Sequence, residues 1–142
     1  MVGILITGHG HFATGLASSL QLITGITEKV AAVDFEEVHS ADVLKANLHK
    51  ALDSLNDCDG VLVLADLAGG FPFQMVCMCK VERPEQKIEI LTGTNLPMMI
   101  EGASMMRAYN DPGELAETLI LTGKEGIGCF KLEESEGDIG II

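Results

Sequence analysis

Short apolar runs alternate with segments of helical periodicity along this chain. Residues 2–6, 30–35, 60–65 and 88–91 are largely apolar runs, which is typical of strands buried on both faces of a sheet. Between the first two runs, Phe12, Leu16, Leu20 and Ile23 recur on one face of a helix that stops at Gly25. Strands that alternate with helices form parallel βαβ units. The pattern therefore predicts an α/β fold, with an open, doubly wound sheet and helices on both faces.

Capping residues and glycines predict where the other helices lie. Ser40 is an expected N-cap for a second helix, and a third helix is expected over residues 75–80. A fourth helix is expected over 98–106, and Asp111, Pro112 and Glu114 begin a fifth that runs to about residue 121 and stops at Gly123. Residues 127–132 are expected to form a last strand, followed by a solvated acidic tail at 133–138. No linker interrupts the chain, so residues 1–142 are expected to form a single domain.

Three glycine-bearing loops follow predicted strands. They are Gly8-His9-Gly10, Gly69-Gly70 and Gly93-Thr94-Asn95, after the first, third and fourth strands. Doubly wound sheets bind ligands at the carboxyl ends of their strands, where the winding direction reverses. If the strand order is 2-1-3-4, the first and third strands are neighbours about 4.8 Å apart. His9 and Asp66 would then face each other at the switch point.

A histidine and an aspartate in that position suit phosphoryl chemistry. Asp66 can accept the proton of one ring nitrogen of His9 and leave the lone pair of the other nitrogen free to act as a base or nucleophile. Backbone N–H groups of a glycine loop at a helix N-terminus favour an anion. The plainer interpretation is that His9 is held by local hydrogen bonds and that Asp66 caps a turn. The residues alone leave both interpretations open.

The same glycines also fit a nucleotide-binding fingerprint. Gly8-His9-Gly10 opens a helix after a strand, and Asp34 ends the second strand where a ribose-binding acid would fall. The chain supplies only about half of a dinucleotide fold, and His9 would crowd a pyrophosphate. We keep a small nucleotide-binding domain as an alternative.

Composition narrows the classes of partner. Nine Lys and Arg against twenty-one Asp and Glu give a net charge of −12, which argues against nucleic acid and anionic membrane surfaces and favours partners with a basic face. The four cysteines form no C-x-x-C pair, and His9-x-His11 has no neighbouring acid or thiol to complete a metal site, so we expect neither a metal nor another cofactor. The residues at the beginning of the chain lack a basic segment and a long apolar run, so we expect no signal peptide, and no apolar stretch reaches the roughly 20 residues of a membrane span. A cytoplasmic protein with reduced thiols is expected.

Phe71 is expected to lie on an apolar loop tip, in the segment Gly69-Gly70-Phe71-Pro72-Phe73. Such a loop tip suits contact with a protein partner.

Three motifs resemble those of a known family. Thr7-Gly8-His9-Gly10, the segment from Asp66 to Phe73 and Thr92-Gly93-Thr94-Asn95-Leu96-Pro97 resemble the mannose-family EIIA domain of the bacterial sugar phosphotransferase system (PTS). The resemblance covers nearly the whole chain. It implies a phosphotransferase that accepts a phosphoryl group from phospho-HPr onto His9, with Asp66 as hydrogen-bond partner, and passes it to a cognate EIIB for sugar uptake. It also implies a homodimer that exchanges an antiparallel edge strand, here residues 127–132. Gly8, Gly10, Gly69, Gly70 and Phe71 are then expected to bind the phosphoryl group or the partner.

Two features depart from the family pattern. Phe71 stands where the family often has Ser or Thr, so a hydroxyl donor is missing and backbone amides must hold the phosphoryl oxygens. Leu67-Ala68 stands where the mannose transporter's domain has a polar residue and Trp, and the glycine motifs look closer to the N-acetylgalactosamine branch. A related dihydroxyacetone kinase phosphocarrier is a further alternative. The transported sugar is not predicted, because sugar recognition belongs to the membrane components.

Overall fold

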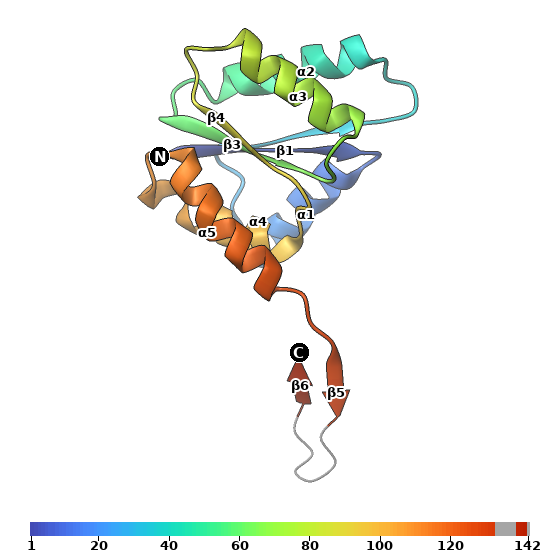
Figure 1. Ribbon diagram of the computed structural model, residues 1–142, viewed down its shortest axis with the longest axis vertical. Coiled ribbons are helices and arrows are strands. Elements are labelled where there is room, and N and C mark those ends of the chain that lie inside the picture. Colours follow the sequence, from blue (N-terminus) through green and yellow to red (C-terminus); the bar gives the residue numbers. More distant parts are fainter. Residues whose placement is uncertain (133–138, 142) are drawn as a thin grey trace.

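Four parallel strands form the centre of the molecule. The computed structural model describes residues 1–132 and 139–141, and Figure 1 shows its sheet between two layers of helices. The strands are β1 (Val2–His9), β2 (Val30–Phe35), β3 (Gly60–Ala65) and β4 (Ile88–Leu91). They lie in the order β2-β1-β3-β4, and all three pairings are parallel. The predicted open sheet and its strand order are confirmed.

Five helices cover the two faces of this sheet. They are α1 (Phe12–Thr24), α2 (Ala41–Ser54), α3 (Phe71–Glu82), α4 (Leu96–Met105) and α5 (Pro112–Glu125), with a short 3₁₀ turn, η1 (Met106–Ala108), after α4. Helices α2 and α3 lie on one face, and α1, α4 and α5 lie on the other (Figure 1). None of the helices in the described ranges is both long and apolar enough to cross a bilayer.

Alternate residues of β1 pack into two separate cores. Ile4 and Ile6 join a cluster with α1, α4 and α5, whereas Leu5 joins a cluster with α2 and α3. All three side chains are fully buried. Because successive side chains of a strand point to opposite faces, a strand covered on both faces must be apolar at every position. This explains the continuous apolar runs in the sequence.

Two predicted boundaries next to the glycine loops were wrong, each for a local reason. Strand β1 runs to His9 instead of Ile6, because Gly8 and His9 still pair with Asp34 and Phe35 of β2. Helix α3 begins at Phe71 instead of Met75, because Pro72 occupies the first turn, where its missing N–H costs no hydrogen bond.

Gly123 does not stop the fifth helix. Helix α5 continues to Glu125, and Gly123 lies buried within it. A Cβ built on Gly123 would lie 2.6 Å from Cγ and Sδ of Met98, so this glycine marks the close contact between α4 and α5. The helix ends at Gly126, which is its C-cap.

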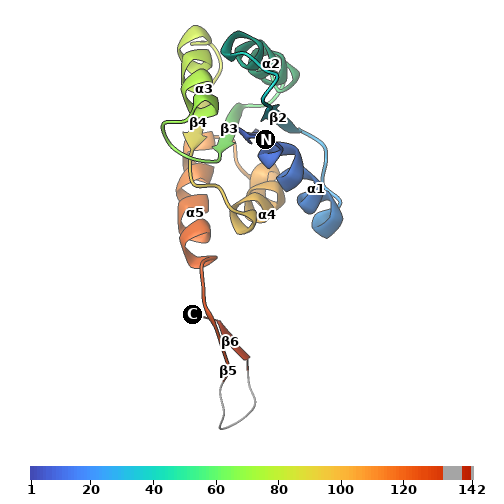
Figure 2. The same cartoon turned by 90° about the vertical axis from the view of Figure 1, so that its right-hand side faces the viewer.

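The C-terminal segment forms a separate hairpin. Strands β5 (Phe130–Leu132) and β6 (Ile139–Ile141) pair antiparallel in a two-stranded sheet that projects from the end of α5 (Figures 1 and 2). The predicted last strand is thus present, but it begins at Phe130 instead of Ile127. The predicted acidic tail at 133–138 lies outside the described residues.

Candidate phosphoryl-transfer site

The ends of β1 and β3 bring His9 and Asp66 together. His9 is the last residue of β1, and Asp66 directly follows β3. Because these strands are parallel neighbours, their carboxyl ends lie at the same edge of the sheet. Nδ1 of His9 lies 2.7 Å from Oδ2 of Asp66. The predicted juxtaposition of these two residues is confirmed.

Asp66 fixes both the backbone and the ring of His9. Its Oδ2 also accepts the N–H of His9 at 2.9 Å, and its Oδ1 accepts the N–H of Leu67 at 2.8 Å. Partial burial opposes ionisation of this carboxyl, but these hydrogen bonds outweigh burial and hold the pKa of Asp66 below its ordinary value. An ionised carboxylate can only accept, so Nδ1 of His9 carries the proton and Nε2 of the neutral ring keeps its lone pair.

Gly70 determines what the other side of the His9 ring faces. A Cβ built on Gly70 would lie 2.5 Å from Cε1 of His9 and 3.2 Å from Nε2, so a side chain has no room there. Gly70 is the N-cap of α3 and provides no side-chain cap. In the ranges that the structure describes, the amides of Phe71 and Phe73 donate no hydrogen bond. The side of the ring that carries Nε2 therefore faces an uncapped helix N-terminus, which favours an anion.

The other predicted glycines shape the loops around His9. A Cβ on Gly8 would lie 2.5 Å from Cδ1 of Phe12 and 2.9 Å from Cγ of Asp66, so Gly8 permits the close approach of α1 and Asp66. Gly10 and Gly69 have φ angles of 58° and 85°, which favour glycine. The amide of Gly10 donates to the carbonyl of Phe35 at 2.7 Å and is thus already paired.

An aromatic row extends from His9 to the surface. The ring of Phe35 lies edge-on to the rings of His9 and Phe71, with centroid distances of 6.1 Å in both cases. Phe71 lies in the first turn of α3 and not on a loop tip, but 52% of it is exposed, as a partner contact requires. The sequence reasoning missed Phe35. The assumed strand order could have indicated Phe35, because this residue of β2 is in register with His9.

Asp34 binds the beginning of α1. Its Oδ1 accepts the N–H of Thr14 at 3.0 Å, and its Oδ2 accepts the Thr14 hydroxyl at 2.6 Å and lies 3.2 Å from Nδ1 of His11. Partial burial opposes ionisation, but these hydrogen bonds outweigh it and lower the pKa of Asp34. Asp34 thus caps a helix from a neighbouring strand, and the ribose-binding role that the nucleotide alternative gives it competes with this cap.

The loop after β4 supports the site from behind. The amide of Gly93 donates to the carbonyl of Asp66 at 3.0 Å, and the Thr94 hydroxyl donates to the carbonyl of Ala65 at 2.7 Å. Asn95 caps α4 by accepting the N–H of Met98 at 3.1 Å. This third glycine-bearing loop holds the Asp66 segment in place.

His9 and His11 point to different carboxylates. His9 contacts Asp66, whereas His11 lies between Asp34 and Glu36. Among the residues the structure describes, no cluster of three or more His, Cys, Asp or Glu side chains could hold a metal ion.

Comparisons with known proteins agree with this geometry. A family model described as the PTS system fructose IIA component, EIIA-man, matches residues 3–120. The chain belongs to this family. As an EIIA protein, the chain is a component of the phosphotransferase system.

Relatives and solved structures of this EIIA chain carry related names. It is 31% identical over 137 residues to the PTS system mannose-specific EIIAB component of Escherichia coli (strain K12), a match that covers 95% of this chain and 41% of that protein. It is 30% identical to the PTS system fructose-specific EIIA component of Bacillus subtilis (strain 168), over 74% of this chain and 70% of that one. The chain therefore spans less than half the length of the mannose-specific relative.

Two solved structures have a similar fold. The phosphotransferase system component EIIA from Streptococcus agalactiae superposes with a TM-score of 0.83 at 34% identity, over 89% of this chain and 95% of that chain. The mannose/sorbose-specific IIA subunit from Enterococcus faecalis gives 0.81 at 28% identity, over 93% and 96%.

Proposed function

We propose that Nε2 of His9 accepts a phosphoryl group from phospho-HPr and passes it to a cognate EIIB. The observation that carries this proposal is the orientation of one ring: Nδ1 lies 2.7 Å from Asp66, and the side that carries Nε2 faces the open N-terminus of α3 at Gly70. With 44% of its side chain exposed, His9 is accessible to a partner protein.

In the transfer, the Nε2 lone pair attacks phosphorus in line with the bond to the donor. The new N–P bond forms as the donor bond breaks, and the donor atom keeps its electron pair. The proton on Nδ1 stays in its hydrogen bond with Asp66, whose negative charge stabilises the positive ring. The amides of Phe71 and Phe73 at the uncapped N-terminus of α3 would donate to the phosphoryl oxygens, while Gly8 and Gly10 shape the loop that presents His9. No step requires a metal.

Intact-mass spectrometry tests the proposed acceptor. After incubation with phosphoenolpyruvate, enzyme I and HPr, wild type should gain one acid-labile phosphoryl group and His9→Ala should gain none. His11→Ala is the matched control, because it removes a nearby histidine that already lies between two carboxylates, and it should still be labelled. Labelling of a folded His9→Ala variant would disprove the assignment. If the phosphorylated chain transferred its phosphoryl group to a dihydroxyacetone kinase subunit and not to EIIB, the proposed acceptor would be wrong and the phosphocarrier alternative would take its place.

We further propose that residues 1–142 act as one EIIA unit that dimerises through its C-terminal segment. Ile127, Phe130 and Leu132 are 75%, 59% and 65% exposed, which is unusual for large apolar side chains. Strand β4 pairs only with β3 within the described residues, so one of its edges is open. The β5 segment of a second copy could pair with the open edge of β4, and this exchange would bury the exposed apolar side chains. Truncation after Gly126 should yield a monomer in size-exclusion chromatography with light scattering, and a stable dimer would rule out the exchange.

A further inference from the structure

The edge strand β2 presents unpaired backbone groups. The N–H of Ile4 donates to the carbonyl of Lys29, and the N–H of Gly10 donates to that of Phe35. In a parallel ladder, alternate residues face the same neighbour, so the odd-numbered residues of β2 face β1. The backbone groups of Ala32 and Asp34 therefore point to the free edge, where no strand pairs with β2 among the residues that the structure describes.

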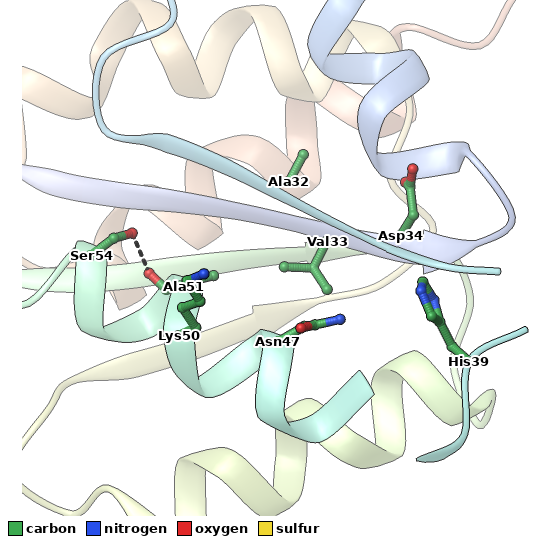
Figure 3. Close-up of a pocket in the computed structure, with 8 residues that line it drawn as sticks. All are labelled: Ala32, Val33, Asp34, His39, Asn47, Lys50, Ala51 and Ser54. Carbon is green, nitrogen blue, oxygen red and sulfur yellow. Dashed lines mark hydrogen bonds between the residues drawn. The ribbon is translucent and has the colours of Figure 1, made fainter. Parts of the chain in front are cut away.

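A hollow lies on each side of this free edge. On the α2 side, a hollow of about 380 Å³ is lined by Ala32, Val33, Asp34, His39, Asn47, Lys50, Ala51 and Ser54. Figure 3 shows it between β2 and α2, with the side chain of Val33 on the α2 side of the strand and that of Asp34 toward α1. On the α1 side, a hollow of about 260 Å³ is lined by Thr14, Ala17, Ser18, Gln21, Ile26, Thr27 and Val30. The edge is thus a recessed groove between two helices.

We propose that this edge binds an extended segment of a partner protein as an added strand. Main-chain hydrogen bonds to Ala32 and Asp34 would supply affinity, as in other cases of strand addition. Side chains of an added strand alternate between the two faces of the sheet, so successive residues would enter the α2-side and the α1-side hollow in turn. The two hollows match this alternation.

The charge of this chain indicates which kind of partner segment would bind to the groove. The chain has a net charge of −12, and Glu36, Glu37 and Asp42 lie just beyond the end of β2. A basic segment complements this field. Lys50 lines the α2-side hollow and forms no ion pair in the described part of the chain, so an Asn, Gln or Ser side chain suits that hollow better than a basic one. A second copy of this chain is a poorer occupant, because α1 and α2 flank the edge and the same helices flank the edge of the copy.

Two substitutions should weaken binding at the groove in different ways. Ala32→Pro deletes an N–H that points away from β1, and proline is tolerated at such positions of edge strands. Asn47→Arg fills the α2-side hollow from an exposed position on α2 and leaves β2 unchanged. Ala46→Arg is the matched control for the second variant, because it adds the same side chain to the next exposed position of the same helix, outside the hollow.

The experiment uses a displayed library of random seven-residue peptides, panned on the full chain. Enriched peptides should be net positive, and synthetic copies should bind about tenfold more weakly to Ala32→Pro and to Asn47→Arg in fluorescence polarisation, since the first variant loses a backbone hydrogen bond and the second loses a side-chain site. Binding to Ala46→Arg should equal wild type, and bound peptide should slow hydrogen exchange of the Ala32 and Asp34 amides.

Three results would overturn the proposal. They are a failure to enrich net-positive peptides, equal binding by Ala32→Pro and Asn47→Arg, and a dimer that Ala32→Pro dissociates, which would make a second copy the occupant. Peptide binding should persist in His9→Ala, so the outcome does not depend on whether His9 is the phosphoryl acceptor.

Discussion

His9 and His11, two residues apart in the sequence, each pair with an aspartate, and the two pairs differ in what surrounds them. His9 and Asp66 are 2.7 Å apart, and His11 and Asp34 are 3.2 Å apart. Both carboxylates are nearly buried, both accept backbone amides, and the pKa of each is lowered. The pairs differ at Nε2, which in His9 lies on the side of the open α3 terminus and in His11 lies 3.2 Å from Oε1 of Glu36.

This difference is the reason why we propose His9, and not His11, as the nucleophile. Both ring nitrogens of His11 lie 3.2 Å from a carboxylate oxygen, so each nitrogen already has an acidic neighbour. His9 has one carboxylate partner, so Nε2 is free. Under the proposed function, a histidine–aspartate pair would therefore not be sufficient for phosphoryl acceptance; the second nitrogen would also have to face an electropositive site such as the uncapped N-terminus of α3.

The largest expected effect comes from closing that site. Gly70→Ala places a Cβ against Cε1 of His9 and should displace the ring from its attacking position, so we expect the rate of phosphoryl acceptance to fall about 100-fold or more. Quench-flow labelling with phospho-HPr measures this rate. Gly15→Ala is the control, because a Cβ there meets no atom within 4 Å and should only stabilise α1. A normal rate in Gly70→Ala would show that Nε2 attacks in another direction.

Asp66→Asn removes the charge from the first pair. The Asn side chain can donate to Nδ1 and so shift the proton to Nε2, and the loss of a charge-assisted hydrogen bond should slow acceptance roughly 10- to 100-fold. The same assay with Asp34→Asn, the matching change in the second pair, should show a rate within about twofold of wild type. Equal slowing in both variants would remove the distinction between the pairs.

Asp34→Asn should instead affect stability. It weakens the cap on α1, which should lower the free energy of unfolding by about 1 kcal/mol. Urea denaturation followed by circular dichroism measures this change. An unchanged midpoint would mean that the hydrogen bonds of Thr14 contribute nothing net.

Acid should weaken both pairs. The folded-state pKa of each aspartate is lowered, so its contribution to stability is present above the unfolded pKa of about 3.9 and is lost as the pH falls through the folded pKa. Unfolding titrations between about pH 5 and 2 should give a shallower loss of stability in Asp34→Asn than in wild type. Identical slopes would contradict the role of Asp34.

The smallest expected effect is a more favourable phosphorylation equilibrium when a hydrogen-bond donor is added at the uncapped N-terminus of α3. Phe71→Ser adds a hydroxyl in the first turn of α3, where the amides face the proposed phosphoryl group. One additional hydrogen bond of about 1 kcal/mol should shift the phosphorylation equilibrium toward the phosphorylated chain about fivefold. Phe71→Ala, which removes the ring without adding a donor, is the control in a mass-spectrometric equilibrium assay. No difference between the two variants would place the phosphoryl oxygens elsewhere.

Much of the site could be predicted because it follows from strand order. The periodicity predicts parallel strands, the carboxyl ends of parallel neighbours meet, and His9 and Asp66 stand at two such ends. The role of Asp34 could not be predicted in this way, because its hydrogen bonds to Thr14 and His11 depend on how α1 packs against β2. The beginning of α3 was missed because Gly70 and Pro72 are read locally as a turn, although they also begin a helix without a side-chain cap.

Apolar periodicity and the positions of strand ends are local properties of the chain, so they were enough to predict the α/β class, the parallel strands and the strand ends at which His9 and Asp66 stand. That β1 and β3 are neighbours was an assumption at that point, and the structure confirms it. The tertiary structure decided which histidine keeps a free nitrogen, which helix terminus is capped and which is open, and that the C-terminal strands form a projecting hairpin. The first two features depend on contacts between residues far apart in the sequence, such as Asp34 with Thr14, 20 positions apart, and Gly70 with His9, 61 positions apart. Such contacts are determined by packing across the two faces of the sheet, which no short stretch of sequence encodes.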